Sequence, residues 1–266
     1  MVRAVPGWLR IAAFVFVLLA AIFMLAPLVV VMGVSVSESQ FVAFPPQGFT
    51  LRWYENALGS PAYLGAFWLS LNLAVLVTVS ASLLGGAAAI GLSRGRRSGG
   101  AVETFFLSPL VLPSIIFAIG LLMLWSAVFG ATSFYALWLA HTVVAIPYVI
   151  RTTLAVLAER DPFLEEAART MGATRLKRLW FVTLPQCRPG LLAGAFFAFN
   201  ISFDEAVLSL FLRNPNLTTL PVQIYGQLEF SPDPTVAAVS TLMILITVAL
   251  MLILERMLGL TRFASG

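Results

Sequence analysis

The sequence is poor in charged residues and rich in apolar ones. Only 11% of its 266 residues are charged and 60% are hydrophobic, whereas a soluble globular domain carries about 25% charged residues. A soluble fold of this length has too little interior to hide so much apolar side chain. Disordered chains are excluded as well, because they are poor in apolar residues. The composition therefore indicates an integral membrane protein.

Cysteine, histidine and lysine each occur once, as Cys187, His141 and Lys177. A single cysteine excludes a disulfide framework and a cysteine-cluster metal site. A single histidine excludes the HExxH motif and other multi-histidine metal motifs. The lysine follows no glycine-rich run, so the chain has no P-loop that would hold ATP. We therefore expect no metal, no cofactor and no catalytic residue in this chain.

Long charge-free stretches predict membrane-spanning helices, because a helix needs about 20 mostly apolar residues to cross a bilayer. The stretch from Thr104 to Ile150 is too long for one helix, and its Gly-Ala-Thr-Ser cluster at 130–133 divides it. An all-α, polytopic membrane protein with one domain over 1–266 is predicted. Its six spans lie at about 11–33, 64–91, 105–128, 134–150, 190–212 and 235–254.

Basic residues set the predicted orientation, since cytoplasmic loops carry an excess of Lys and Arg. With both termini in the cytoplasm, every basic residue except Arg52 and Arg213 falls on the inside. The inside segments are then 1–10, 93–103, 151–189 and 255–266. The net charge of +4 thus lies beside the anionic cytoplasmic leaflet. We expect membrane lipid, and no nucleic acid, as its partner.

The first apolar run has an alternative interpretation as a cleaved signal peptide, because Arg3 and Arg10 precede it. Signal peptides have hydrophobic regions of about 7–15 residues. The charge-free run from Ile11 to Val36 is longer, so we expect the first span to remain in the protein.

The inside segment 151–189 begins with a predicted amphipathic helix. Asp161 is suited to cap it, with Pro162 at the first helical position. Glu165 and Arg169 have the spacing of an i,i+4 ion pair. Gly172 supplies a stop signal at the carboxyl end of the helix.

A second amphipathic helix follows in the same segment, with Thr174 as its cap and Pro185 as its end. Apolar residues gather on one side and basic residues on the other. Such a helical pair either lies on the membrane surface or docks a cytoplasmic partner, and its amphipathic pattern alone favours neither.

A motif in this segment resembles the EAA signature of the permease subunits of ABC importers. It runs Glu166-Ala167-Ala168, three residues, Gly172, nine residues, Val182, one residue, Leu184-Pro185. Valine in place of isoleucine is its single departure. The stretch 49–54 resembles the one that follows the first span in these permeases. The stretches 202–205 and 220–225 resemble the spermidine/putrescine branch, in particular its second permease subunit.

The resemblance implies the MetI-like fold of type I importers and a transport subunit of the bacterial inner membrane, not an enzyme. It also implies a second, unlike permease subunit, two ATP-binding subunits that hold ATP and Mg²⁺, and a periplasmic solute-binding protein. Segment 151–189 would be the coupling loop, seated in a groove of the ATPase. The coupling residues would be Phe163, Glu165, Glu166, Ala167, Ala168, Arg169, Gly172, Leu184 and Pro185.

Asp204 and Glu205 interrupt the fifth predicted span. A charged side chain deep in a membrane helix costs about 3 kcal/mol on insertion scales. A carboxylate on a water-filled path suits a cationic solute such as a polyamine, and Asn200 and Ser202 would add hydrogen bonds. The alternative is that one or both acids pair with a neighbouring helix or cap an irregular break.

His141 lies in the fourth predicted span, where an ionisable group is often functional. It is either a proton-relay or solute ligand, or a hydrogen-bonding group between helices, and the absence of an identifiable partner favours the second. Pro109, Pro113 and Pro147 are expected to kink their helices.

Three other functions compete with a polyamine permease. The same role for another small nitrogenous solute, such as GABA, an amino acid or an opine-like compound, agrees equally with the EAA signature. A stand-alone secondary transporter predicts inverted repeats, which the sequence does not display. A membrane enzyme needs a nucleophile–base or metal constellation, for which one histidine gives little basis.

Overall fold

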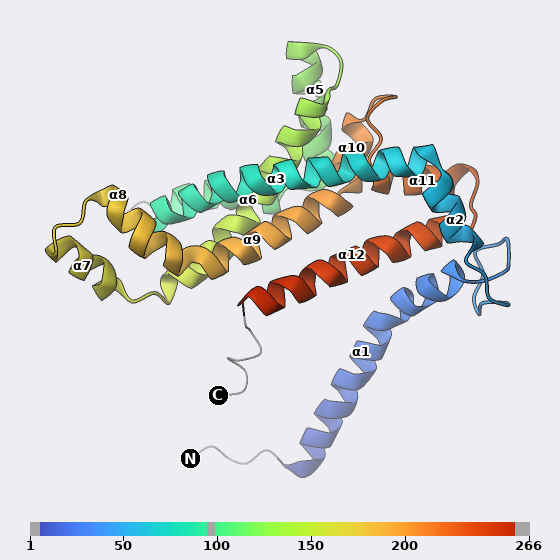
Figure 1. The fold of residues 1–266 in the computed structure, drawn as a ribbon, viewed down its shortest axis with the longest axis horizontal. Coiled ribbons are helices and arrows are strands. Elements are labelled where there is room, and N and C mark those ends of the chain that lie inside the picture. Colours follow the sequence, from blue (N-terminus) through green and yellow to red (C-terminus); the bar gives the residue numbers. More distant parts are fainter. Residues whose placement is uncertain (1–5, 95–98, 259–266) are drawn as a thin grey trace. The chain divides into compact units, whose positions relative to one another are not determined.

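The computed structural model describes residues 6–94 and 99–258, and every regular element in these two stretches is helical (Figure 1). The chain forms two compact units, Met1–Leu64 with Ile224–Ile246 and Gly65–Gln223 with Thr247–Gly266, where the sequence predicted one domain. The boundaries fall inside helices α3 (Pro61–Arg94) and α12 (Thr235–Leu258). Because both helices are apolar around residues 64–65 and 246–247, no change in composition marks the boundaries.

The first unit contains α1 (Gly7–Ser35) and α2 (Arg52–Gly59). Trp53 is buried, and its indole N–H donates to the carbonyl oxygen of Ser37 at 2.7 Å. The hydroxyls of Ser35 and Tyr54 are also 2.7 Å apart. These bonds hold α2 against the end of α1, which explains why aromatic residues follow the first span.

In the second unit, α6 (Phe134–Ala158) packs most extensively against α9 (Leu184–Asp204). The two helices meet at Gly190 and Gly194, which form a GxxxG motif. A Cβ atom on Gly190 would lie 2.7 Å from the Thr152 carbonyl oxygen, and one on Gly194 would lie 2.8 Å from Val149 Cα. Glycine is required at both positions because the backbones approach so closely.

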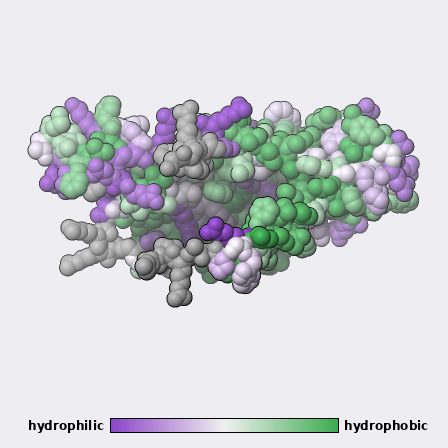
Figure 2. Space-filling view, turned by 90° about the horizontal axis from the view of Figure 1, so that it is seen from below, coloured by the Kyte–Doolittle hydropathy of each residue, from purple (hydrophilic) through white to green (hydrophobic). Residues whose placement is uncertain are grey.

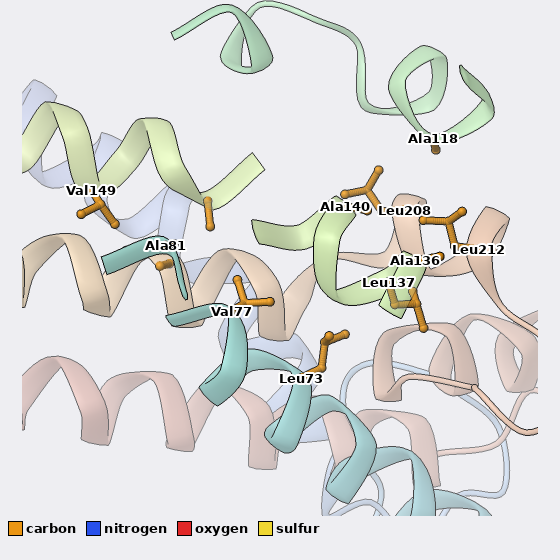
Figure 3. Packing of buried hydrophobic residues seen from close by; sticks show 12 residues of the cluster. Leu73, Val77, Ala81, Ala118, Ala136, Leu137, Ala140, Val149, Leu208 and Leu212 are labelled. Carbon is orange, nitrogen blue, oxygen red and sulfur yellow. The ribbon is translucent and has the colours of Figure 1, made fainter. Parts of the chain in front are cut away.

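A hydrophobic core joins the helices of this unit. Figure 3 shows side chains from α3, α5 (Ser114–Phe129), α6 and α10 (Ala206–Leu212) in this cluster. Many of its members are alanines, which fits the close helix packing of membrane proteins. The buried members are Leu73, Val77, Ala81, Ala118, Ala136, Leu137, Ala140, Ala145, Val149, Ala198, Leu208 and Leu212.

Four helices are long and apolar enough to cross a membrane: α1, α3, α6 and α12. Two bent pairs meet the same criterion together, residues 100–110 with 114–129 and residues 175–204 with 206–212. The described residues therefore contain six candidate spans when each bent pair is taken as one.

The predicted third span, 105–128, is divided. It consists of α4 (Gly99–Leu107), a 3₁₀ turn η1 (Ser108–Leu110) and α5, with a 93° bend between the halves. Pro109 lies in the turn and Pro113 directly precedes α5. Neither proline has an N–H to continue a helix, so the expected kink is a complete break, whereas α6 continues through Pro147.

The predicted fifth span, 190–212, is also divided, and its helix begins earlier than predicted. The segment 151–189 contains the end of α6, α7 (Pro162–Thr170), α8 (Arg175–Arg178) and a π-helical turn η2 (Leu179–Thr183) that leads into α9. The prediction that Pro185 ends a helix is wrong, because residues 175–204 form one helical run. The π-helical turn changes the hydrogen-bond register where the proline ring would meet the preceding carbonyls.

Candidate functional site

Residues 161–185, which we call the coupling segment after their predicted role, have the helix caps and the glycine turn that the sequence predicts. The Asp161 carboxylate accepts from the backbone N–H of Phe163 at 2.9 Å and caps α7. The Thr174 hydroxyl accepts from the N–H of Lys177 at 3.4 Å. Gly172 has φ +80°, a left-handed conformation that costs glycine little. Two helices joined by a sharp glycine turn are therefore confirmed.

Glu165 on α7 is held by two arginines. Arg94 Nη2, at the end of α3, lies 3.0 Å from Oε1, and Arg160 Nη1 lies 3.1 Å from Oε2. Arg94 Nη2 also donates to the Thr183 hydroxyl at 3.1 Å. The predicted ion pair of Glu165 with Arg169 is absent from the described residues, because guanidinium groups from other elements already engage both carboxylate oxygens.

The coupling segment presents a large apolar surface. Its exposed side chains are Phe163, Leu164, Met171, Leu176, Trp180 and Phe181. Figure 2 shows hydrophobic and hydrophilic groups mixed at the left end of the view, where α7 and α8 lie in Figure 1. Exposed apolar surface rimmed by polar groups is typical of an interaction site.

The predicted coupling residues fall into two groups. The exposed group is Phe163, Glu166, Ala167, Arg169, Gly172 and Pro185, and the half-buried group is Glu165, Ala168 and Leu184. Leu184 packs against the buried Ile90, Leu157 and Cys187. Burial therefore separates an exposed group from residues that pack or form ion pairs within the chain.

A cavity of about 380 Å³ lies where the two helix breaks of the second unit meet. The break after η1, the middle of α6 and the carboxyl end of α9 surround it. Non-helical backbone at membrane depth is tolerated where protein buries it or where it borders a water-filled space. The lining residues are Pro109, Leu110, Leu112, Ser114, Val144, Tyr148, Asn200, Ile201, Asp204 and Glu205.

The two acids at the second break have different surroundings. Glu205 accepts from the backbone N–H groups of Val207 and Leu208 at 2.9 and 3.1 Å, and so caps α10. Asp204, the last residue of α9, is exposed and lines the cavity. The predicted alternative of capping a break thus describes Glu205, while the Asp204 carboxylate faces the open space.

Helix ends add to the field in this cavity. The carboxyl end of α9 carries about half a negative charge and the amino end of α5, at Ser114, about half a positive one. These two contributions oppose each other. The carboxylates of Asp204 and Glu205 both line the cavity, and none of the described lining residues is basic. The cavity is therefore suited to a cation.

The other two residues predicted for the solute path, Asn200 and Ser202, lie in different surroundings. Asn200 lines the cavity, and its amide donates to the Phe196 carbonyl at 2.8 Å. Ser202 is buried, and its hydroxyl lies 3.0 Å from His141 Nδ1. The structure thus brings Asn200 together with the two acids and places Ser202 outside the cavity lining.

His141 forms the predicted hydrogen bonds between helices, because Ser209 of α10 lies 3.2 Å from its Nε2. The sequence did not single out Ser209, Tyr148 or Leu110. For η1, the signal was the pair of closely spaced prolines, Pro109 and Pro113, which predicted a kink there. Among the described residues, no group of three metal-ligating side chains lies close enough to hold a metal ion.

Comparison with known proteins identifies the family. Residues 81–260 match the family described as binding-protein-dependent transport system inner membrane component. The chain belongs to this family. A putrescine transport system permease protein of Escherichia coli (strain K12) is 34% identical over 86% of this chain and 84% of its own length. A spermidine/putrescine transport system permease protein of Haemophilus influenzae is 30% identical over 91% of this chain and 93% of its own length.

Solved structures agree on the fold. A bacterial ABC transporter involved in the import of the acidic polysaccharide alginate matches with a TM-score of 0.70 and 16% identity, over 95% of this chain and 98% of its own. The MetNI methionine ABC transporter matches with a TM-score of 0.62 and 21% sequence identity, over 73% of this chain and 93% of its own. The type I importer permease fold inferred from the EAA signature is confirmed, and the chain is a multi-pass permease subunit of the inner membrane.

Proposed function

We propose that this permease forms half of the path for a small cationic solute of the polyamine class, such as putrescine or spermidine. The observation that carries the proposal is the exposed Asp204 carboxylate, in a cavity where two helix breaks meet. The putrescine and spermidine/putrescine systems of the two relatives support the same class of solute.

The chemistry of the cavity lining supports a diamine or polyamine. An ammonium group about 4 Å from a carboxylate gains about 1 kcal/mol in bulk water and about 4 kcal/mol at the effective dielectric constant near a protein surface. Leu110, Val144 and Ile201 offer apolar contacts to a methylene chain. Tyr148 also lines the cavity, and an aromatic ring can hold a second ammonium group by a cation–π contact.

The alternative class of solute differs from the polyamines by carrying a negative charge. GABA, amino acids and opine-like compounds carry a carboxylate besides their ammonium. Asp204 would repel that carboxylate, and none of the described lining residues is basic. The charge of the lining therefore favours polyamines over these compounds.

The proposal assigns ATP hydrolysis to other subunits. The exposed apolar face of α7 and α8 would dock on one of two ATP-binding subunits, which hold ATP and Mg²⁺. An unlike permease subunit would complete the path, and a periplasmic binding protein would deliver the solute. The coupling segment would face the cytoplasm, as would both termini, whose residues 1–5 and 259–266 lie outside the described part.

Uptake of labelled putrescine and spermidine by cells that express the complete importer tests the proposal. We expect the wild type to take up both, with GABA and amino acids failing to compete at tenfold excess. Asp204→Asn, which keeps the side-chain shape, should lower polyamine uptake. Uptake of GABA or an amino acid with no uptake of polyamines would overturn the substrate assignment.

A further inference from the structure

His141 connects the two sides of the break in the fifth span. Its Nδ1 lies 3.0 Å from the Ser202 hydroxyl on α9, and its Nε2 lies 3.2 Å from the Ser209 hydroxyl on α10. The break itself, at Asp204 and Glu205, falls between these two serines in the chain. A single side chain of α6 therefore binds both halves of the bent helix.

Both hydrogen bonds are buried. His141 is 1% exposed, Ser202 3% and Ser209 1%. A neutral imidazole donates at one ring nitrogen and accepts at the other, and each serine hydroxyl can serve in either role. Loss of one partner would leave a buried polar atom unsatisfied, which is costlier than loss of an exposed bond.

The surrounding helices make α6 a suitable frame for the bend. Gly190 and Gly194 bring α9 into close contact with α6, and α10 also packs on α6. Between α9 and α10 the axis turns by 52°. The break interrupts the helical backbone hydrogen bonds, and Glu205 caps only the amino end of α10. His141 supplies the polar connection that spans the break itself.

We infer that His141 is a positioning residue, which fixes the bend and thereby holds Asp204 at the cavity. It touches no solute in this role, since its ring is buried and bonded on both nitrogens. The inference rests on the proposed function in one respect, namely that the solute contacts Asp204. The bend and the exposure of Asp204 do not depend on which solute is carried.

A double-mutant cycle isolates the bond across the break. His141→Asn keeps a donor and an acceptor near the Nδ1 position and loses the reach to Ser209, while Ser209→Ala removes the other partner. Both variants act on one bond, so the double variant should be no worse than the more affected single variant. Thr142→Val is the matched control, because within the described part of the chain the Thr142 hydroxyl donates to the Trp138 carbonyl of its own helix and to no residue of α9 or α10.

The first readout is the accessibility of position 204 in the complete, assembled importer. Asp204→Cys is introduced together with Cys187→Ala, and the rate of labelling by a water-soluble thiol reagent is measured. Loss of a buried hydrogen-bond partner should change this rate by about five- to tenfold in His141→Asn and in Ser209→Ala. The Thr142→Val control should label at the unsubstituted rate.

The second readout separates positioning from damage to the fold. With Asp204 restored, the solute transported per ATP hydrolysed is measured in proteoliposomes with the binding protein. Positioning predicts a several-fold lower ratio while the stimulated ATPase rate is kept. General damage would lower the amount of assembled importer and both rates together.

Unchanged labelling in the assembled His141→Asn and Ser209→Ala variants would overturn the inference. The inference would also be overturned if the two single effects on the labelling rate multiplied in the double variant. That result would place His141 and Ser209 in separate interactions. Changed labelling with an unchanged ratio of putrescine to ATP would support the positioning role and contradict the proposed contact of the solute with Asp204.

Discussion

The coupling segment and the cavity each contain two adjacent acids, Glu165-Glu166 and Asp204-Glu205, and each uses one of them internally. Glu165 is held by Arg94 and Arg160, and Glu205 caps α10. Their neighbours Glu166 and Asp204 are exposed. In both regions, one carboxylate is engaged within the chain and its neighbour in the sequence is exposed.

The two regions should also fail in different ways. Under the proposed docking of the coupling segment on an ATP-binding subunit, a defect in this segment should lower the stimulated ATPase rate together with uptake. A defect at the cavity leaves the ATPase cycle intact, so only the solute carried per ATP should fall. The following predictions test this distinction.

The largest effect is expected for Glu166→Lys. Charge reversal on the exposed face of α7 places a like or unpaired charge in the docking groove, which costs several kcal/mol when desolvated. Uptake and binding-protein-stimulated ATPase should both fall to background, with the permease still present in the membrane. Retained ATPase stimulation would show that this face does not dock the ATP-binding subunit. Glu255→Lys, a charge reversal in the last turn of α12, is a control outside the segment.

A smaller effect is expected when the partners of Glu165 are removed. Arg94 and Glu165 are partly exposed, at 40% and 24%, and such ion pairs contribute about 0–1 kcal/mol. Glu165→Gln and Arg94→Gln should each lower uptake by up to about fivefold, which is the factor that corresponds to about 1 kcal/mol. The double variant should resemble the single ones in uptake assays. Fully multiplicative losses would contradict a shared interaction.

The smallest effect is expected at Glu205, where amide and alanine substitutions should differ. Glu205→Gln keeps an acceptor oxygen for Val207 and Leu208, so transport should be nearly unchanged. Glu205→Ala removes the cap, which costs about 0.5–2 kcal/mol, and should lower the melting temperature of the purified importer. Equal stability of the two variants would contradict the capping role.

The sequence predicted local features well. Asp161, Gly172 and Thr174 mark the ends of the coupling helices through rules that involve only a few neighbouring residues, and the structure has each of these features. The EAA spacing likewise lies within one segment. Such features depend on nearby backbone, which a sequence displays directly.

The cavity could not be predicted in the same way, because its residues come from distant parts of the chain. Pro109 and Asp204 each indicated an irregular helix, and nothing in the sequence showed that the two irregularities meet. Arg94 was missed as a partner of Glu165 for the same reason, since the two residues are 71 positions apart. Ser202 was placed on the path by its position beside Asp204, although its hydroxyl points to His141.

The fold alone does not determine the charge of the solute. A transporter of similar fold is involved in the import of an acidic polysaccharide, while relatives of this chain belong to polyamine systems. The charges at the cavity are therefore the features to test.

The most direct test compares Asp204→Asn with Glu205→Gln in the assembled importer. Each variant changes one neighbouring acid to its amide, and the putrescine carried per ATP hydrolysed is measured. We expect a fall of about tenfold for Asp204→Asn at an unchanged ATPase rate, which corresponds to loss of a charge contact worth about 1.4 kcal/mol. For Glu205→Gln we expect a ratio close to that of the wild type. Equal effects of the two variants, or a larger effect at Glu205, would contradict the division of roles between the two acids.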